Sequence, residues 1–183
     1  MNFNEHYNLR GRHAFLSPSN YHWVNDTPEQ LERRWFNAMA KKRGVELHEF
    51  ASDAIRLNRK LPKNNDTLNS FVNDALGYSM DSEQVLYYSD NCFGTADAIS
   101  FNRGTLRVHD LKTGVTPANM TQLALYAALF CLEYGKDPRQ MAIELRIYQN
   151  NEKVIHIPEP DEIRELMNII VEADSQVDVL RTR

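Results

Sequence analysis

The sequence predicts an α/β fold in which a mixed central sheet is flanked by helices. Segments rich in β-branched and aromatic residues fall between residues 84 and 112 and between 141 and 157, and apolar residues recur at helical spacing around them. No internal repeat or long Pro/Gly linker divides the 183 residues, a length that suits one substantial core. We therefore expect a single domain over residues 1–183.

Capping and breaking residues predict the helix boundaries. Thr27 before Pro28 is typical of a helix start, and Gly44 and Pro62 favour helix ends. Between Gly44 and Pro62 the apolar residues follow a 3.6-residue period, at Leu47, Phe50, Ala51, Ala54 and Ile55. The expected helices cover residues 27–43, 45–61, 66–77 and 117–134, and a last one begins near residue 160. The expected strands are residues 84–89, 93–101, 105–112, 141–149 and 153–157.

The hairpin formed by the second and third strands places two acids among apolar residues. Because alternate residues of a strand share a face, Asp97 and Asp110 fall on the apolar faces of their strands. If the loop has an even number of residues, such as the two-residue loop Arg103-Gly104, these two carboxylates lie side by side, with Lys112 one step further. The same loop gives the apolar pairs Phe101/Leu106 and Ile99/Val108. A three-residue loop would break this registry.

Two carboxylates opposite each other on a half-buried face repel, so a positive charge must lie between them. Lys112 supplies one such charge. A divalent cation, Mg²⁺ or Mn²⁺, is the other candidate, because its usual ligands are carboxylate oxygens and water. The simpler alternative is a buried Asp–Lys ion pair beside one accidental acid.

Several short motifs, in their order along the chain, resemble those of the PD-(D/E)xK nuclease superfamily, and in particular of its RecB-like branch. The resemblance extends from Leu16 to about Gln149. The matching segments are Gly94-Thr95-Ala96-Asp97, Asp110-Leu111-Lys112-Thr113-Gly114 and Gln122-Leu123-Ala124-Leu125-Tyr126, with Gly44-Val45-Glu46-Leu47-His48-Glu49 and Ser17-Pro18-Ser19 upstream.

The resemblance implies a restriction-endonuclease-like αβββαβ core with added N-terminal and C-terminal helices. It also implies that Asp97, Asp110 and the main-chain carbonyl of Leu111 hold Mg²⁺ or Mn²⁺, with Lys112 as a catalytic lysine. In the family, the residues that match Gln122 and Tyr126 orient this lysine or contact DNA. Core packing of Tyr126 and a surface position for Gln122 are the plainer alternative.

The family's helical metal ligand matches either His48 or Glu49. At ~100° per residue, His48 falls at the border of the apolar stripe and Glu49 nearly opposite the stripe. We therefore expect His48 to be the ligand, with Glu49 as the second choice. A half-buried packing role for His48 is the plainer alternative. Upstream, Ser17, Ser19 and Tyr21 are candidates for binding phosphates or stacking a base, and a plain polar loop is the alternative.

Composition narrows the function classes. Cys92 and Cys131 are too few and too far apart for a zinc site or an iron–sulfur cluster. Residues 26–63 have an excess of basic side chains and residues 150–183 an excess of acidic ones. Charge alone favours two solvated helix faces, and a polyanion bound on one side is the alternative. The start of the sequence has no apolar signal core and no segment reaches the ~20 apolar residues of a membrane span, so we expect an intracellular protein without a membrane partner.

The expected function is that of a metal-dependent nuclease that hydrolyses DNA phosphodiester bonds. The resemblance favours an exonuclease used in recombination, repair or phage DNA metabolism, and so includes a phage-encoded source. The alternatives are a non-catalytic module that binds nucleic acid or a protein partner on the same fold, and an RNA endonuclease. A homo-oligomer or a separate helicase or recombination partner is compatible with a sequence that lacks a GxxxxGK[ST] motif.

Overall fold

The computed structural model describes residues 4–114 and 116–181. Its contacts divide the chain into two compact units, residues 1–45 and residues 46–183. The whole sheet lies in the second unit, together with the helices that pack on it. The single domain over residues 1–183 stays a prediction.

The first unit contains two short 3₁₀ helices, η1 (Tyr7–Leu9) and η2 (Pro18–Asn25), and the beginning of α1 (Pro28–Arg56). Thr27 caps α1 as predicted: the Gln30 N–H donates to Thr27 Oγ1 over 3.3 Å, and the Thr27 N–H donates to Gln30 Oε1 over 2.8 Å. The predicted break at Gly44 is wrong, because α1 continues through this residue. One glycine costs a helix interior only about 1 kcal/mol, which a long helix tolerates.

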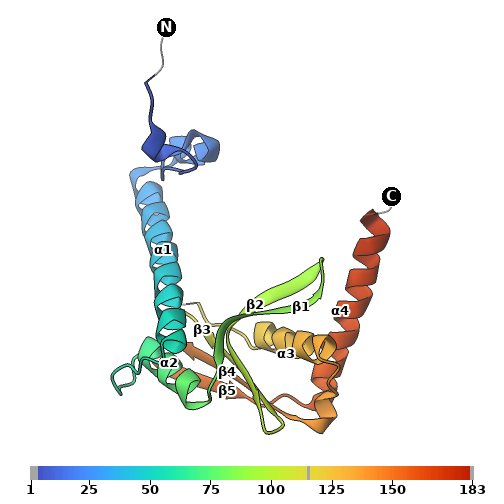
Figure 1. Cartoon of the computed structure of the whole chain (residues 1–183). Helices are drawn as coiled ribbons and strands as arrows, with labels where there is room; N and C mark the ends of the chain where they lie inside the picture. Colours follow the sequence, from blue (N-terminus) through green and yellow to red (C-terminus); the bar gives the residue numbers. More distant parts are fainter. Residues whose placement is uncertain (1–3, 115, 182–183) are drawn as a thin grey trace. The chain divides into compact units, whose positions relative to one another are not determined.

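The second unit is built on a five-stranded sheet in the order β1-β2-β3-β4-β5. Strands β3 and β4 are parallel, whereas every other neighbouring pair is antiparallel, so the sheet is mixed as predicted. Figure 1 shows its strands, which are β1 (Asp81–Ser89), β2 (Cys92–Asn102), β3 (Thr105–Leu111), β4 (Ala142–Gln149) and β5 (Glu152–His156).

Helices cover both faces of this sheet (Figure 1). Asp66 caps α2 (Thr67–Gly77) by accepting from the Leu68 and Asn69 N–H groups, as its position in the sequence predicts. The parallel pair β3 and β4 needs a crossover connection, and α3 (Thr121–Glu133) provides it. The remaining elements are η3 (Pro138–Gln140) and α4 (Pro160–Arg181).

Each face of the sheet has its own apolar core. On one face α3 and α4 cover a cluster that includes Leu86, Ala96, Val108, Leu123 and Ile163. On the other face α2 and the C-terminal part of α1 cover a smaller cluster that includes Ala51, Ala54, Phe71, Ala98 and Tyr148. The predicted stripe on α1 is only partly right, because Phe50 is 46% exposed and the buried face turns toward His48 and Ser52.

The β2–β3 turn has the predicted two-residue form. Arg103 and Gly104 have φ values of 52° and 76°, the pair of positive angles that a type I′ turn requires. The predicted pairs Phe101/Leu106 and Ile99/Val108 are present. The regular pairing ends at Ala98/His109, so the expected continuation of the ladder to Asp97/Asp110 is wrong.

Strict alternation along β2 is also wrong. Ala96 and Ile99 belong to the cluster under α3, whereas Ala98 belongs to the cluster under α1 and α2. Opposite this irregularity, Glu83 of β1 has a φ of 52°, between the regular pairs formed by its two neighbours. The change of face explains how β2 accommodates an acid, because Asp97 faces α1 and not the core under α3.

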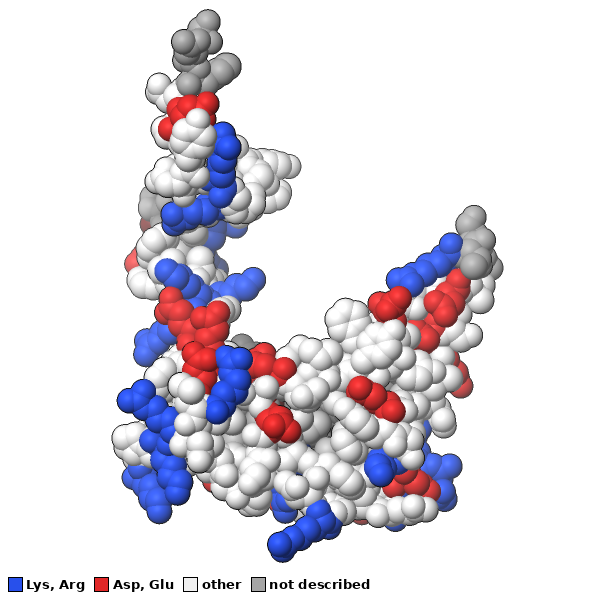
Figure 2. All heavy atoms as spheres, viewed as in Figure 1, with Lys and Arg blue, Asp and Glu red and all other residues white. Residues whose placement is uncertain are grey.

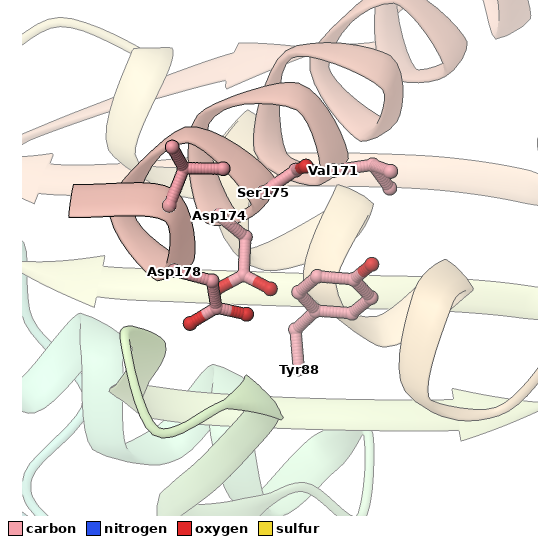
Figure 3. A pocket seen from close by; sticks show the side chains of 6 residues that line it. Tyr88, Val171, Asp174, Ser175 and Asp178 are labelled. Carbon is pink, nitrogen blue, oxygen red and sulfur yellow. The ribbon is translucent and has the colours of Figure 1, made fainter. Parts of the chain in front are cut away.

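Helix α4 is attached to the tip of the β1–β2 hairpin by polar contacts. Asp174 accepts hydrogen bonds from the Ser89 hydroxyl and from Asn91 Nδ2. Beside these contacts is an acidic hollow of about 430 Å³, lined by Tyr88 of β1 and residues of α4 (Figure 3). Among the described residues, no helix has the length and apolar character needed to cross a membrane.

Candidate active site

Three side chains from three elements converge where β2 leaves the regular ladder. They are His48 of α1, Glu83 of β1 and Asp97 of β2, and one ligand atom of each lies within 4.8 Å of the others. An imidazole nitrogen and two carboxylate oxygens are suitable ligands for a divalent cation. We call these three residues the acid cluster.

His48 occupies the helical position expected for a metal ligand. Its Nδ1 lies 3.3 Å from Asp97 Oδ2, and its side chain is 31% exposed. Glu49 is exposed, as helix geometry predicts. The hydrogen bond to Asp97 raises the pKa of His48, and the charges of the surrounding carboxylates act in the same direction.

Asp97 of β2 connects this strand to β3 at the point where the main chains of the two strands stop pairing. Its Oδ2 accepts a hydrogen bond from the Leu111 N–H over 2.8 Å. The side chain therefore takes the place of a ladder partner, which explains why the regular pairing ends at Ala98/His109. This bond fixes Asp97 against the end of β3, next to Asp110.

Asp110 is nearly inaccessible, at 3% exposure. Its Oδ1 accepts from Lys112 Nζ over 3.0 Å, whereas its Oδ2 is buried with no hydrogen-bond partner among the described residues. Burial raises the pKa of Asp110, and the charge of Asp97 raises it further. This buried oxygen has no partner among the described residues, and the charges of Asp97 and His48 act on the same carboxyl, so Asp110 is a further candidate ligand for a cation.

Lys112 is held between β3 and α3. Its Nζ donates to Asp110 Oδ1 over 3.0 Å and to Gln122 Oε1 over 2.9 Å. Gln122 therefore orients the lysine, and is not only a polar surface residue. An ammonium group has three N–H donors, and two of them have these partners among the described residues, so the third can donate to a ligand.

Tyr126 of α3 holds β2 in place through a hydrogen bond to its main chain. One helical turn after Gln122, it donates from its hydroxyl to the Thr95 carbonyl over 2.6 Å. A Cβ at Gly94 would lie 3.0 Å from Tyr126 Cε1, a tight contact that the ring or the strand would have to relieve by moving. The G-x-x-D and Q-x-x-x-Y motifs thus meet in space, and Tyr126 positions β2 without reaching the acid cluster by a hydrogen bond of its own.

Glu83 is the site residue that the sequence analysis missed. It lies between Ser82 and Gln84 in a polar edge strand, and no spacing motif includes it. Its left-handed backbone is uncommon for a residue other than glycine and brings its carboxylate toward Asp97. Partial burial raises the pKa of Glu83, as does the charge of Asp97.

The remaining predicted site residues lie elsewhere or have a different contact. Ser17 and Ser19 share a hydroxyl hydrogen bond of 2.7 Å in the first unit, where Tyr21 stacks on His22. Leu111 reaches the site through its N–H, and its carbonyl as a metal ligand stays a prediction. Binding of nucleic acid by the Ser17–Tyr21 segment also stays a prediction.

Comparison of the chain with protein-family models, with curated proteins and with solved structures finds no match.

Proposed function

We propose that this protein is a metal-dependent nuclease that hydrolyses phosphodiester bonds in DNA. The observation that carries the proposal is the convergence of His48, Glu83 and Asp97, together with Asp110, whose second oxygen is buried with no partner among the described residues. A lysine fixed within hydrogen-bond distance of this acid completes a set of groups suited to phosphoryl chemistry.

The acid cluster and Asp110 would hold Mg²⁺ or Mn²⁺. When bound, such a cation polarises a phosphoryl oxygen and lowers the pKa of a coordinated water. Asp97 orients His48 and is itself fixed by the Leu111 N–H, so two of the ligands have little freedom to turn away. This arrangement favours a preformed site.

Lys112 contributes a fixed positive charge. Asp110 and Gln122 each accept one of its N–H groups, and the third can donate to a phosphate oxygen or to the attacking water. Negative charge grows on the phosphate oxygens during hydrolysis, and an ammonium that is already oriented stabilises that charge without reorganising.

The motif resemblance supports three further parts of the proposal. They are DNA as the substrate, exonuclease action, and a role in recombination, repair or phage DNA metabolism. An intracellular location, with an oligomer or a helicase as partner, belongs to the same proposal. The hollow beside α4 is not part of the site: Tyr88 lines it (Figure 3) and packs against the core under α3, whereas Asp97 faces His48 of α1.

The test is the digestion of labelled single-stranded DNA, duplex DNA and RNA by the wild type, Asp97→Asn, Lys112→Ala and the control Asp174→Asn. We expect cleavage with Mg²⁺ or Mn²⁺ and none with EDTA, full activity in the control, and a loss of at least a hundredfold in the two site variants. Equal cleavage by all four proteins would assign the activity to a contaminant. Cleavage of RNA alone would select the RNA endonuclease, and metal binding without any cleavage would select the binding module.

A further inference from the structure

An exposed aromatic surface leads away from the acid cluster along the β1–β2 hairpin. Tyr87 of β1 lies opposite Phe93 of β2 in the register. Glu83 lies four residues from Tyr87 in β1, and Asp97 lies four residues from Phe93 in β2. With Val85 between them, these side chains share one face of the hairpin. We call Val85, Tyr87 and Phe93 the aromatic stripe. At ~3.3 Å per residue, its rings lie about 13 Å from the acids.

The stripe occupies the open face of the hairpin. Leu86 and Ala96, which alternate with its residues, are 1% and 0% exposed in the core under α3. In contrast, Val85 is 48%, Tyr87 46% and Phe93 62% exposed. A strand that reaches the acid cluster along this hairpin must therefore pass over the stripe.

The two rings are held in place before any ligand arrives. Their centroids are 6.4 Å apart with an interplanar angle of 26°. The Tyr87 hydroxyl donates to Asp90 Oδ1 over 3.0 Å, and the Tyr87 N–H donates to Glu133 Oε2 over 2.9 Å. Fixed rings lose little conformational entropy when a ligand stacks on them.

The stripe itself contains no charged residue, and the surface over the hairpin is mostly neutral in Figure 2, with acidic residues nearby. A ligand bound here is therefore held by ring faces and apolar contact and not by charge. The flat faces of nucleobases suit such a surface, and they are accessible in a single strand but not in a duplex.

We propose that the aromatic stripe binds the unpaired bases of a single-stranded nucleic-acid segment whose backbone passes the acid cluster. This inference rests on the proposed function and names the substrate form that the site accepts. Continuity between the stripe and the acids on one hairpin face is what selects this ligand.

The test is the binding of a short labelled oligothymidylate in EDTA, which prevents cleavage. Phe93→Ala and Tyr87→Ala are each expected to weaken binding about tenfold, and Phe93→Trp to retain it. The loss should persist at high salt, because stacking is not screened. Tyr134→Ala is the matched control, since this exposed tyrosine follows α3 and lies outside the stripe. Binding of a blunt duplex should change little in every variant.

Circular dichroism of each variant confirms folding, and Phe93→Leu separates the loss of the ring face from the loss of apolar area. Unchanged oligothymidylate binding in Phe93→Ala and Tyr87→Ala would overturn the proposed binding of bases by the aromatic stripe. The proposal of metal-dependent cleavage would not be affected. A stripe variant that turns a dimer into a monomer, with no change in binding, would also overturn it. A wild type that neither binds nor cleaves any nucleic acid would instead overturn the proposed function.

Discussion

Among single residues, Glu83 and Asp110 carry the electrostatic cost of bringing several acids together. Burial is the first cause of the raised pKa of each carboxyl, and the charge of Asp97 is the second. A folded-state pKa above the unfolded value means that the ionised carboxylate destabilises the folded chain at neutral pH. A bound cation would remove this cost.

Replacing Asp110 by Asn should therefore stabilise the metal-free protein. We expect its unfolding temperature in EDTA to rise by about 2–4 °C, the shift that about 1 kcal/mol produces in a chain of this size. Adding Mn²⁺ should raise the unfolding temperature of the wild type but not of the variant. Differential scanning calorimetry with and without the metal measures both effects. An Asp110→Asn protein that unfolds earlier in EDTA would show that the ion pair with Lys112 outweighs the burial cost.

His109 is a buried histidine outside the proposed chemistry. It is fully buried, with its Nδ1 3.3 Å from the Tyr148 hydroxyl. Burial lowers its pKa to about 3, and the charge of Arg146 acts in the same direction. The unfolded chain therefore takes up a proton near pH 6.5 that the folded chain does not, so the contribution of His109 falls as the pH decreases from about 6.5 to about 3.

We expect the free energy of unfolding to decrease by up to about 1.4 kcal/mol per pH unit within this window because of His109. Urea titrations between pH 7 and pH 5 measure the slope of the unfolding free energy against pH. His109→Gln should reduce it, and His13→Gln, at an exposed position, is the matched control. Identical slopes in the wild type and the His109 variant would contradict this assignment.

His48 and Glu83 show what the sequence could and could not predict at this scale. The motif resemblance left His48 and Glu49 as candidates, and the helical period favoured His48 because its position at the stripe border pointed inward. Glu83 depends on a local left-handed backbone that no periodicity encodes. The residues next to Glu83 in the sequence indicate only a polar edge strand.

At the scale of elements, the β2–β3 hairpin shows where pattern reasoning succeeds. Its register was predictable because two apolar pairs match only with an even loop, although Arg-Gly is a poorer type I′ turn than Asn-Gly. The end of the ladder was not predictable, because it depends on Asp97 capturing the Leu111 N–H. Such competition between side chain and main chain leaves no trace in residue spacing.

The contact between β2 and α3 gives a prediction about packing. Gly94→Ala would place a methyl group 3.0 Å from Tyr126 Cε1 and force the ring or the strand to move. We expect a loss of about 1–3 kcal/mol of unfolding free energy, measured by urea denaturation. Gly77→Ala, at a site with no neighbouring atoms within 4 Å, is the control. A loss no larger than that of the control would show that Tyr126 moves aside easily.

At the scale of the whole molecule, the mixed sheet between helices follows from the predicted order of helix, three strands, helix and strand. The two compact units were not predicted: the sequence pattern indicated a helix end at Gly44 but no domain boundary, and α1 continues through this residue. Among the described residues of the first unit, Gly44 alone is buried, whereas the second unit contains both apolar clusters.

This difference in burial predicts where proteases cut. Limited digestion with trypsin should cleave first at basic residues of the first unit, such as Arg10 or Arg33, because their backbone opens at little cost. A fragment that contains the sheet should accumulate. Mass spectrometry of the products identifies the cut sites, and early cleavage after Arg107, inside β3, would contradict the prediction.

Calorimetric titration with Mn²⁺ tests most directly whether His48, Glu83, Asp97 and Asp110 form one cation site. The site predicts saturable binding of at least one ion by the wild type, with binding lost in Asp97→Asn, weakened in Glu83→Gln and unchanged in the control Asp174→Asn. Absence of binding by the wild type at millimolar Mn²⁺, or equal binding by all four proteins, would contradict the metal site and with it the proposed nuclease.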